Sequence, residues 1–171
     1  MKVSKPRTAS LTQSRLKELL LYDPDTGMFT RKVPVPGYLA GSIAGSVSQR
    51  GYITIVVDDV SHKAHRLAWL YMKGKHPSKY IDHINGVLSD NRFSNLREAT
   101  PTNNQQNAVL RKDSTSGIKN VKWYKQLKKW VVEIKVNKKS VHIGYFKNIE
   151  DAEQAARLAR EKYHGKFANH G

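Results

Sequence analysis

Hydrophobic residues recur with helical spacing in two segments of the first part of the chain. In residues 11–22, Leu16, Leu19 and Leu20 stand at helical spacing. Residues 63–73 (KAHRLAWLYMK) also predict a helix, and Gly74 suits its end. The buried face of this second helix would consist of Leu67, Trp69, Leu70 and Tyr71. Between these segments the β-branched run GYITIVV at 51–57 predicts a strand, and residues 58–61 predict a turn. The pattern therefore predicts helices and strands mixed in this region.

Beyond these elements the pattern changes to an alternation of polar and apolar positions. Three strand-like segments joined by short turns follow, at residues 118–125, 129–136 and 140–146, and the alternation is clearest in the second. Residues 150–163 then place alanines on one helical face, which lets a helix approach a sheet closely. We expect a small domain of three antiparallel strands and one helix. The polar segment before it places the domain boundary between residues 110 and 111.

The composition is strongly basic. Lys and Arg number 30 against 14 Asp and Glu, a formal net charge of +16, which predicts a polyanionic partner such as nucleic acid. Both predicted domains share this charge, with +7 for residues 1–110 and +9 for 111–171. Cysteine is absent, which excludes disulfides and thiolate metal sites. No apolar run approaches the ~18 residues of a membrane span, so we expect a cytoplasmic protein. Residues 1–10 are short of large apolar side chains, which predicts disorder.

An unusual concentration of polar side chains occupies residues 80–107. Asp82 and His83 are adjacent on a predicted strand, so they point to opposite sides of it. Thr100-Pro101 predicts a helix start, and that helix can bring Asn104 beside Asp82. A histidine with a pKa near neutrality suits a general base, and carboxylate and amide oxygens suit Mg²⁺ or Mn²⁺. The pattern is typical of a one-metal nuclease centre, although a polar loop with a packed histidine is the alternative.

The middle of the chain resembles the HNH endonucleases, in particular the homing type found in phages and introns. The matching sequences are HRLAWLYMKG (65–74), DHINGVLSDNRFSNLREAT (82–100) and NNQQN (103–107). The resemblance implies an α+β chain with a ββα-metal (His-Me finger) core. It also implies His83 as general base with Asp82 and Asn104 on one divalent cation.

The same resemblance assigns further residues around the predicted site. Asn95 would tie the loop and orient the imidazole by a hydrogen bond. The last position is asparagine where many family members have histidine, which makes the site an H-N-N variant and leaves Asn103 or Asn107 as substitutes for Asn104. Arg92 and Arg97 suit phosphate contacts, with loop stabilisation as an equal alternative.

The C-terminal part resembles the Apetala-type (ethylene-response-factor) DNA-binding domain. The matching sequences are SGIKNVKW (116–123), KWVVEIKV, HIGYF, EDAEQAARLA and HGKFAN. The resemblance implies a sheet that lies in the DNA major groove, with contacts from Lys119, Lys122, Trp130 and Lys135. Lysine stands here where the plant domains use arginine, and lysine cannot make a bidentate contact to guanine. For Trp130 a role in the core is an equal alternative.

Together these features predict a metal-dependent endonuclease that cuts or nicks double-stranded DNA in a bacterial or phage-infected cell. A DNA-binding regulator that keeps a nuclease-like scaffold is the alternative from another class, and a broad-specificity nuclease is a third. The intact Asp82, His83 and Asn104 set favours the enzyme, because a regulator does not need it. Whether the protein acts as a monomer or a dimer is left open.

Overall fold

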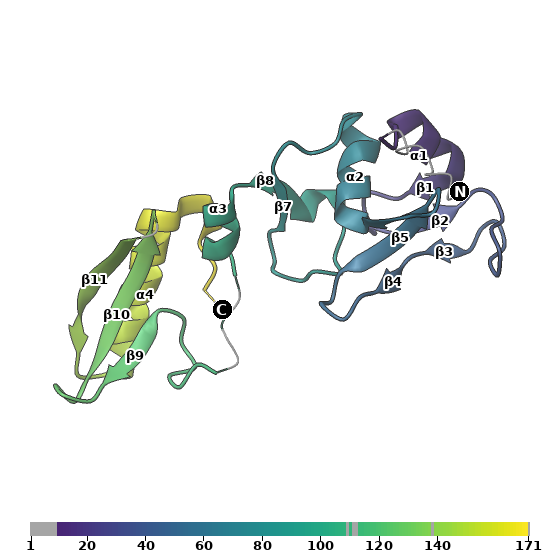
Figure 1. The fold of residues 1–171 in the computed structure, drawn as a ribbon. Helices are drawn as coiled ribbons and strands as arrows, with labels where there is room; N and C mark the ends of the chain where they lie inside the picture. The colour runs from purple at the N-terminus through teal and green to yellow at the C-terminus, as the bar shows by residue number, and fades with distance from the viewer. Residues whose placement is uncertain (1–9, 109, 111–112, 138, 171) are drawn as a thin grey trace, which may run out of the picture. The chain divides into compact units, whose positions relative to one another are not determined.

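The computed structural model describes residues 10–108, 110, 113–137 and 139–170 of the chain (Figure 1). Nearly all of the predicted disordered segment 1–10 lies outside the described residues. The chain divides into two compact units, one ending at Glu98 and the other beginning at Ala99. We describe each unit by itself. Within the described residues, no helix is long and apolar enough to cross a lipid bilayer.

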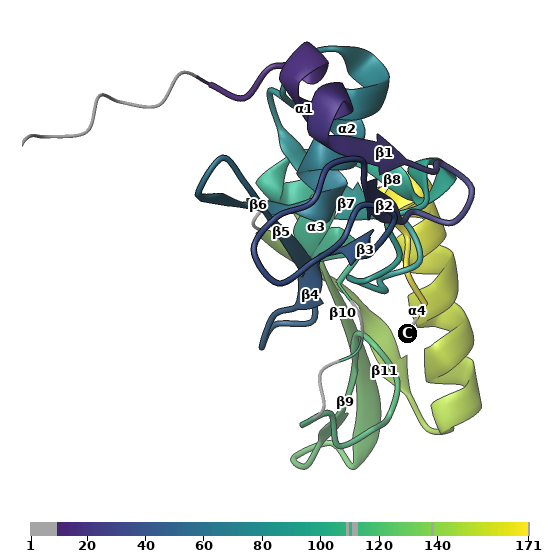
Figure 2. The same cartoon turned by 90° about the vertical axis from the view of Figure 1, so that its right-hand side faces the viewer.

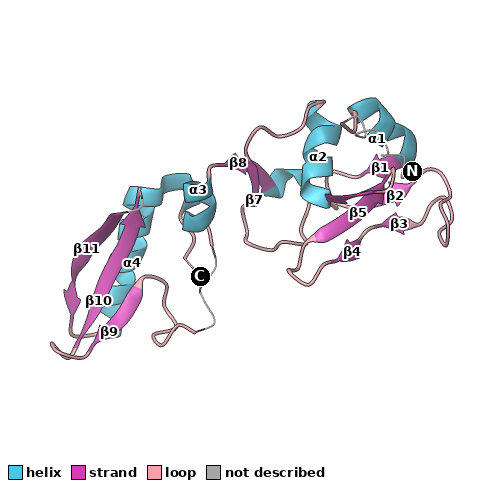
Figure 3. Ribbon diagram, in the orientation of Figure 1, coloured by secondary structure: helices cyan, strands magenta, loops and turns pink. Residues whose placement is uncertain are grey.

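The first unit combines short antiparallel sheets with two helices (Figure 3). One sheet has the order β1-β2-β3 and another has the order β4-β5-β6, while β7 pairs with β8. The elements are α1 (Gln13–Leu19), β1 (Leu20–Tyr22), β2 (Phe29–Arg31), β3 (Ile43–Ala44), β4 (Ser46–Val47), β5 (Ile53–Val57), β6 (Val60–Lys63), α2 (Ala64–Lys73), β7 (Tyr80–His83), the 3₁₀ helix η1 (Phe93–Asn95) and β8 (Leu96–Ala99).

Two local predictions for this unit were wrong. The helix expected over 11–22 ends at Leu19, because Leu20 and Tyr22 are extended and pair with Arg31 and Phe29 of β2. The turn expected over 58–61 is confined to two aspartates with positive φ, after which β6 returns along β5. By contrast, the predicted helix end is confirmed, since Gly74 has φ 74° and its amide bonds the Leu70 carbonyl. Only a residue that tolerates the left-handed region suits this position.

The core of the first unit forms between α1, α2 and the short sheets. Its fully buried side chains include Leu16 of α1, Phe29 of β2 and Leu67 of α2. Ile81 and Leu96 extend this core to β7 and β8. The strand that carries Asp82 and His83 is therefore anchored in the core by the residue before them.

The second unit contains a three-stranded sheet and a long helix. Its elements are α3 (Pro101–Gln106), β9 (Val121–Tyr124), β10 (Lys129–Val136), β11 (Lys139–Phe146), α4 (Ile149–His164) and the 3₁₀ helix η2 (Gly165–Phe167). The sheet is antiparallel with the order β11-β10-β9, and α4 lies along one face of it (Figures 1 and 2). Val121 and Val132 pack there against Ala152 and Ala156. The predicted three strands and alanine-faced helix are confirmed.

The short helix α3 groups with the second unit, although the predicted boundary lies after it, between residues 110 and 111. Thr100 caps α3 as expected, and its hydroxyl accepts from the Asn103 amide in a capping box. The Lys119 ammonium donates to the Gln106 carbonyl at 2.9 Å, and the Asn169 amide donates to the Asn107 carbonyl at 2.8 Å. These contacts between residues distant in sequence explain the grouping.

Candidate active site

Asp82 and His83 stand at the end of β7 and are almost entirely buried, with 4% and 2% of their surface exposed. The β7–β8 pairing continues past the strand, since the Ile84 amide donates to the Asn95 carbonyl at 2.9 Å. Buried charges need partners, so the neighbours of these two side chains define their chemistry.

The carboxylate of Asp82 is held by Arg97 of β8. The guanidinium Nε and Nη2 atoms each lie 2.8 Å from Asp82 Oδ2, and both side chains are largely buried. Arg97 therefore serves as a counter-ion inside the site. This ion pair favours a local structural role for Arg97 over a contact with a DNA phosphate. The phosphate contact of Arg97 stays a prediction.

The imidazole of His83 lies in a mostly aromatic and polar enclosure. Its Nε2 atom is 3.3 Å from Asn91 Oδ1, and its ring meets that of His65 edge-on with centroids 5.0 Å apart. Tyr52 contacts both histidine rings. Burial lowers the pKa of His83, an effect that the Asn91 hydrogen bond and the Asp82 charge oppose. His83 is therefore unprotonated at neutral pH, as a general base must be.

His65 is the second buried histidine of this enclosure. Burial, with the neighbouring His83 as a smaller cause, lowers its pKa to about 3. Its ring packs against those of Tyr52 and His83. Nothing in the spacing of the sequence indicates that it packs against His83, because the two residues are brought together by α2 and β7.

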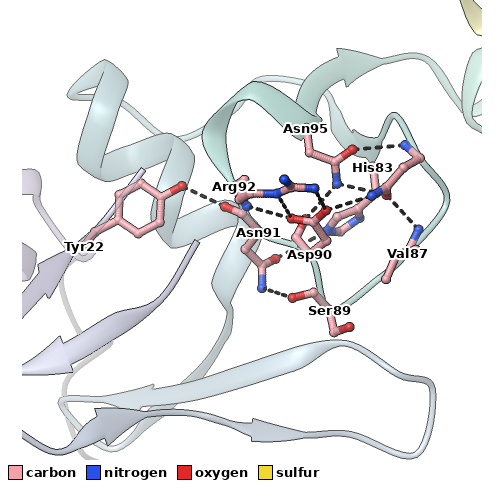
Figure 4. Close-up of polar contacts among 9 residues, drawn as sticks. Tyr22, His83, Val87, Ser89, Asp90, Asn91, Arg92 and Asn95 are labelled. Atoms are coloured by element: carbon pink, nitrogen blue, oxygen red, sulfur yellow. Dashed lines mark hydrogen bonds and ion pairs between the residues drawn. The ribbon is translucent and has the colours of Figure 1, made fainter. Parts of the chain in front are cut away.

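Asn95 ties the loop between β7 and η1 (Figure 4). Its amide nitrogen donates to Asn85 Oδ1 at 3.0 Å and to the Asp90 carbonyl at 2.8 Å, while its oxygen accepts from the Asn85 amide. Arg92 forms a two-pronged contact with the Asp90 carboxylate in the same loop. Asn95 was expected to make the hydrogen bond to the imidazole, but the partner of the imidazole is Asn91, whose Oδ1 accepts. The sequence pattern does not single out Asn91 from the other asparagines.

The three helix asparagines, Asn103, Asn104 and Asn107, belong to the second unit and differ in availability. The Asn103 side chain is engaged in the capping box and in a hydrogen bond to Gln106. Asn107 is buried at the end of the helix. Asn104 is exposed, so of the three it has the side chain most accessible to an outside ligand.

The strand register assigns the predicted DNA contacts of the sheet to different faces. Cross-strand partners share a face, and Trp130 pairs with Trp123 and Phe146 on the side packed against α4. This favours the core alternative for Trp130. The opposite side, which we call the outer face, carries the partners and neighbours of Val131, namely Lys122, Tyr124, Lys129, Glu133, Lys135, His142 and Tyr145.

The predicted contacts Lys122, Lys135 and Lys119 also differ from one another. Lys122 is exposed on the outer face and pairs with Glu133 at 2.7 Å, and Lys135 is exposed on the same face. Lys119 is half-buried against backbone carbonyls, and burial lowers its pKa to about 8. The outer face also holds a ring cluster that the sequence did not reveal, in which Tyr145 contacts Tyr124 and His142.

Comparison with known proteins identifies the domain that carries Asp82 and His83. A family model described as HNH endonuclease matches residues 62–106. Protein 3.8 of Escherichia phage T7 is 32% identical over 107 residues, which make up 62% of this chain and 88% of that protein. The chain belongs to the family of Protein 3.8 and carries an HNH endonuclease domain. No solved structure matches the chain.

The HNH match confirms the resemblance seen in the middle of the chain. The matched segment runs from His62 in β6 to Gln106 in α3, and it includes α2, β7 and β8. The N-terminal strands β1 to β5 and the sheet of the second unit lie outside it. The resemblance of the C-terminal part to the Apetala-type domain stays a prediction.

Proposed function

We propose that the protein is a metal-dependent endonuclease that hydrolyses a phosphodiester bond of double-stranded DNA, with His83 as the general base. The observation that carries this proposal is a buried histidine with a lowered pKa, held by a side-chain hydrogen bond beside a buried carboxylate within the HNH domain. An imidazole in this state can accept a proton from an attacking water at neutral pH.

Asp82 and Asn104 are the residues we propose to hold the cation, with Asn103 or Asn107 as substitutes. The donor set fits a hard divalent ion, because carboxylate and amide oxygens are the ligands that Mg²⁺ and Mn²⁺ prefer. Among the described residues no group of three His, Asp or Glu side chains could hold a metal, so the remaining ligands would be amide, water or phosphate oxygens. When bound, such a cation supplies stabilisation of the negative charge that develops on the phosphate and the leaving oxygen.

The buried contacts of this chain support the other tasks of the site. Arg97 balances the charge of the buried Asp82 carboxylate through the ion pair between them. Asn95 fixes the loop from Asn85 to Asp90, which sets the direction of the chain after His83. Arg92, whose guanidinium is half exposed beside Asp90, remains a candidate for phosphate contact.

We further propose that the outer face of the second unit contacts the DNA backbone. Lys122 and Lys135 are exposed on this face and Lys129 is half-buried there, and lysines at a surface suit phosphate contacts that neutralise charge without reading bases. Lys119 and Trp130, which face carbonyl groups and α4 respectively, are weaker candidates. The proposal places the duplex substrate in the cytoplasm of a bacterial or phage-infected cell, in keeping with the phage relative.

Incubation of supercoiled plasmid with the purified protein and Mg²⁺ or Mn²⁺ tests the proposal. We expect nicked or linear DNA, no reaction with EDTA, and a loss of about 10²- to 10⁴-fold in rate for His83→Ala, the usual contribution of a general base. DNA affinity should persist in this variant. His76→Ala, which alters an exposed histidine outside the candidate site, is the control and should cut normally.

Binding without any cleavage under these conditions would favour the alternative of a non-enzymatic DNA-binding regulator. Cleavage by His83→Ala at the rate of the unaltered protein would show that another group is the base.

A further inference from the structure

The N-terminal hairpin formed by β1 and β2 packs against the active-site loop although it lies outside the HNH match. The Tyr22 hydroxyl donates to the Asn91 carbonyl at 2.7 Å, and the Phe93 amide donates to the Pro24 carbonyl at 2.9 Å. Gly27, in the turn of the hairpin, lies so close that a Cβ atom there would be 2.4 Å from the Asn91 carbonyl carbon. The hairpin therefore holds the backbone of Asn91 from one side.

Asn91 is a buried residue whose two amide atoms have different partners. Its Nδ2 atom donates to the Ser89 carbonyl at 3.1 Å, which fixes the orientation of the amide and turns Oδ1 toward His83 Nε2. An amide oxygen only accepts hydrogen bonds, so the proton of a neutral His83 must be on Nε2. The lone pair that accepts a proton then lies on Nδ1.

Figure 4 shows these groups as one connected series from the hairpin to the imidazole. Tyr22 is 3% exposed and Asn91 is 2% exposed, so both hydrogen bonds are shielded from water. Burial also raises the pKa of Tyr22, which keeps its hydroxyl protonated and able to donate. A shielded series of this kind has one low-energy arrangement, because each buried polar group would be costly to leave without a partner.

We propose that the β1–β2 hairpin is part of the nuclease centre. Tyr22 and Gly27 of the hairpin hold Asn91 in place, an arrangement that we call the clamp. Asn91 in turn fixes the tautomer and the orientation of His83, so that Nδ1 is the basic atom. Asn91 and Tyr22 are positioning residues and do not touch the substrate. The inference rests on the proposed function for its catalytic consequence, but the tautomer itself is a property of the protein without DNA or metal.

The first experiment records the ¹⁵N signals of the His83 imidazole in the full chain without metal. We expect the Nε2–H tautomer in the unaltered protein. Asn91→Leu keeps a side chain of similar branched shape and removes the acceptor, so the preference for this tautomer should disappear. An Nδ1–H tautomer in the unaltered protein, or an unchanged tautomer in Asn91→Leu, would overturn the proposal.

The second experiment measures plasmid cleavage by the same variants. Asn91→Leu should lower kcat by about 10- to 100-fold, the usual cost of losing a group that orients an active-site histidine, while KM for DNA stays unchanged. Tyr22→Phe keeps the buried ring and removes only the hydroxyl, so we expect a smaller loss in kcat, about threefold to tenfold. Tyr38→Phe alters an exposed tyrosine of the same unit and should have no effect.

The outcomes separate this inference from the proposed function. If the unaltered protein does not cut DNA, or if His83→Ala cuts at the normal rate, the proposed function fails. The tautomer measurement then still decides whether Asn91 fixes the ring of His83. If His83 is essential but Asn91→Leu and Tyr22→Phe cut at the normal kcat, the clamp is wrong. A lower melting temperature for Tyr22→Phe with unchanged tautomer and kcat would also overturn it, because the contact would then be structural only.

Discussion

The first unit keeps its reactive side chains inside, whereas the second unit keeps its charged side chains on a sheet surface. Asp82, His83, Asn91 and Asn95 are all at least nine-tenths buried, and each makes a hydrogen bond or an ion pair with a neighbouring side chain. On the outer face, Lys122 and Lys135 are exposed. A buried network holds groups in one geometry, which suits chemistry, while exposed lysines adapt to a polyanion, which suits contact with DNA.

Net charge does not distinguish these two roles. Residues 1–110 carry +7 and residues 111–171 carry +9, so both parts favour contact with a polyanion. What differs is where each unit puts its polar groups relative to its core. Changes in the two units should therefore have effects of different kinds, and three experiments test this contrast.

The largest effect concerns the inner side of the second unit's sheet. Trp130→Ala should lower the free energy of unfolding of this unit by about 2–3 kcal/mol, because it removes a partly buried ring packed against α4. Tyr145→Ala on the outer face should cost at most about 1 kcal/mol, the scale of a cross-strand pair. Urea unfolding followed by circular dichroism compares the two. If Trp130→Ala instead lost DNA affinity without losing stability, the result would favour a DNA contact for Trp130 over a role in the core.

A smaller effect concerns the buried histidines of the first unit. The pKa of His65 falls from 6.5 to about 3 on folding, so between these values the unfolded chain binds more protons and stability decreases as the pH falls. The free energy of unfolding at pH 5 should therefore be lower than at pH 7 or above by on the order of 2 kcal/mol, because of His65 alone. His65→Phe keeps a ring beside His83 and should remove this part of the acid sensitivity.

Hydrogen exchange of the α2 amides at pH 7 and pH 5 measures that difference for the first unit alone. The comparison is between the variant and the unaltered protein, because carboxylates titrate in the same range. Equal acid sensitivity in both proteins would mean that His65 does not lose its proton on folding.

The smallest effect concerns the lysines of the outer face. Replacement of Lys122, Lys129 and Lys135 by Gln should reduce the slope of log K for DNA against log salt concentration by about 2 to 3, since each lost phosphate contact removes about 0.9. Cleavage at saturating DNA should stay unchanged. Fluorescence anisotropy with a labelled duplex over a salt series gives the slope. Arg157→Gln on α4 is the control, and an unaltered slope in the triple variant would contradict a DNA role for the outer face.

Local sequence features were sufficient for much of the fold and for part of the site. Gly74 ends α2, Thr100 caps α3, and the alternation over residues 129–136 gives β10, because capping and periodicity act between residues near in sequence. The Asp82-His83 pair could also be proposed as the chemical centre, since the motif places both on one strand and the HNH match includes it.

Only the tertiary structure decided which groups meet at that centre. Arg97 pairs with Asp82 across two strands, His65 reaches His83 from α2, and Tyr22 bonds Asn91 over 69 residues of sequence. Likewise, the sequence allowed Trp130 either face of the sheet, and packing against α4 selected one. Sequence by itself determined most of the elements and the residue types available to the site. The partners were decided by the packing of distant segments, because hydrogen bonds and ring contacts depend on proximity in space, which local patterns do not encode.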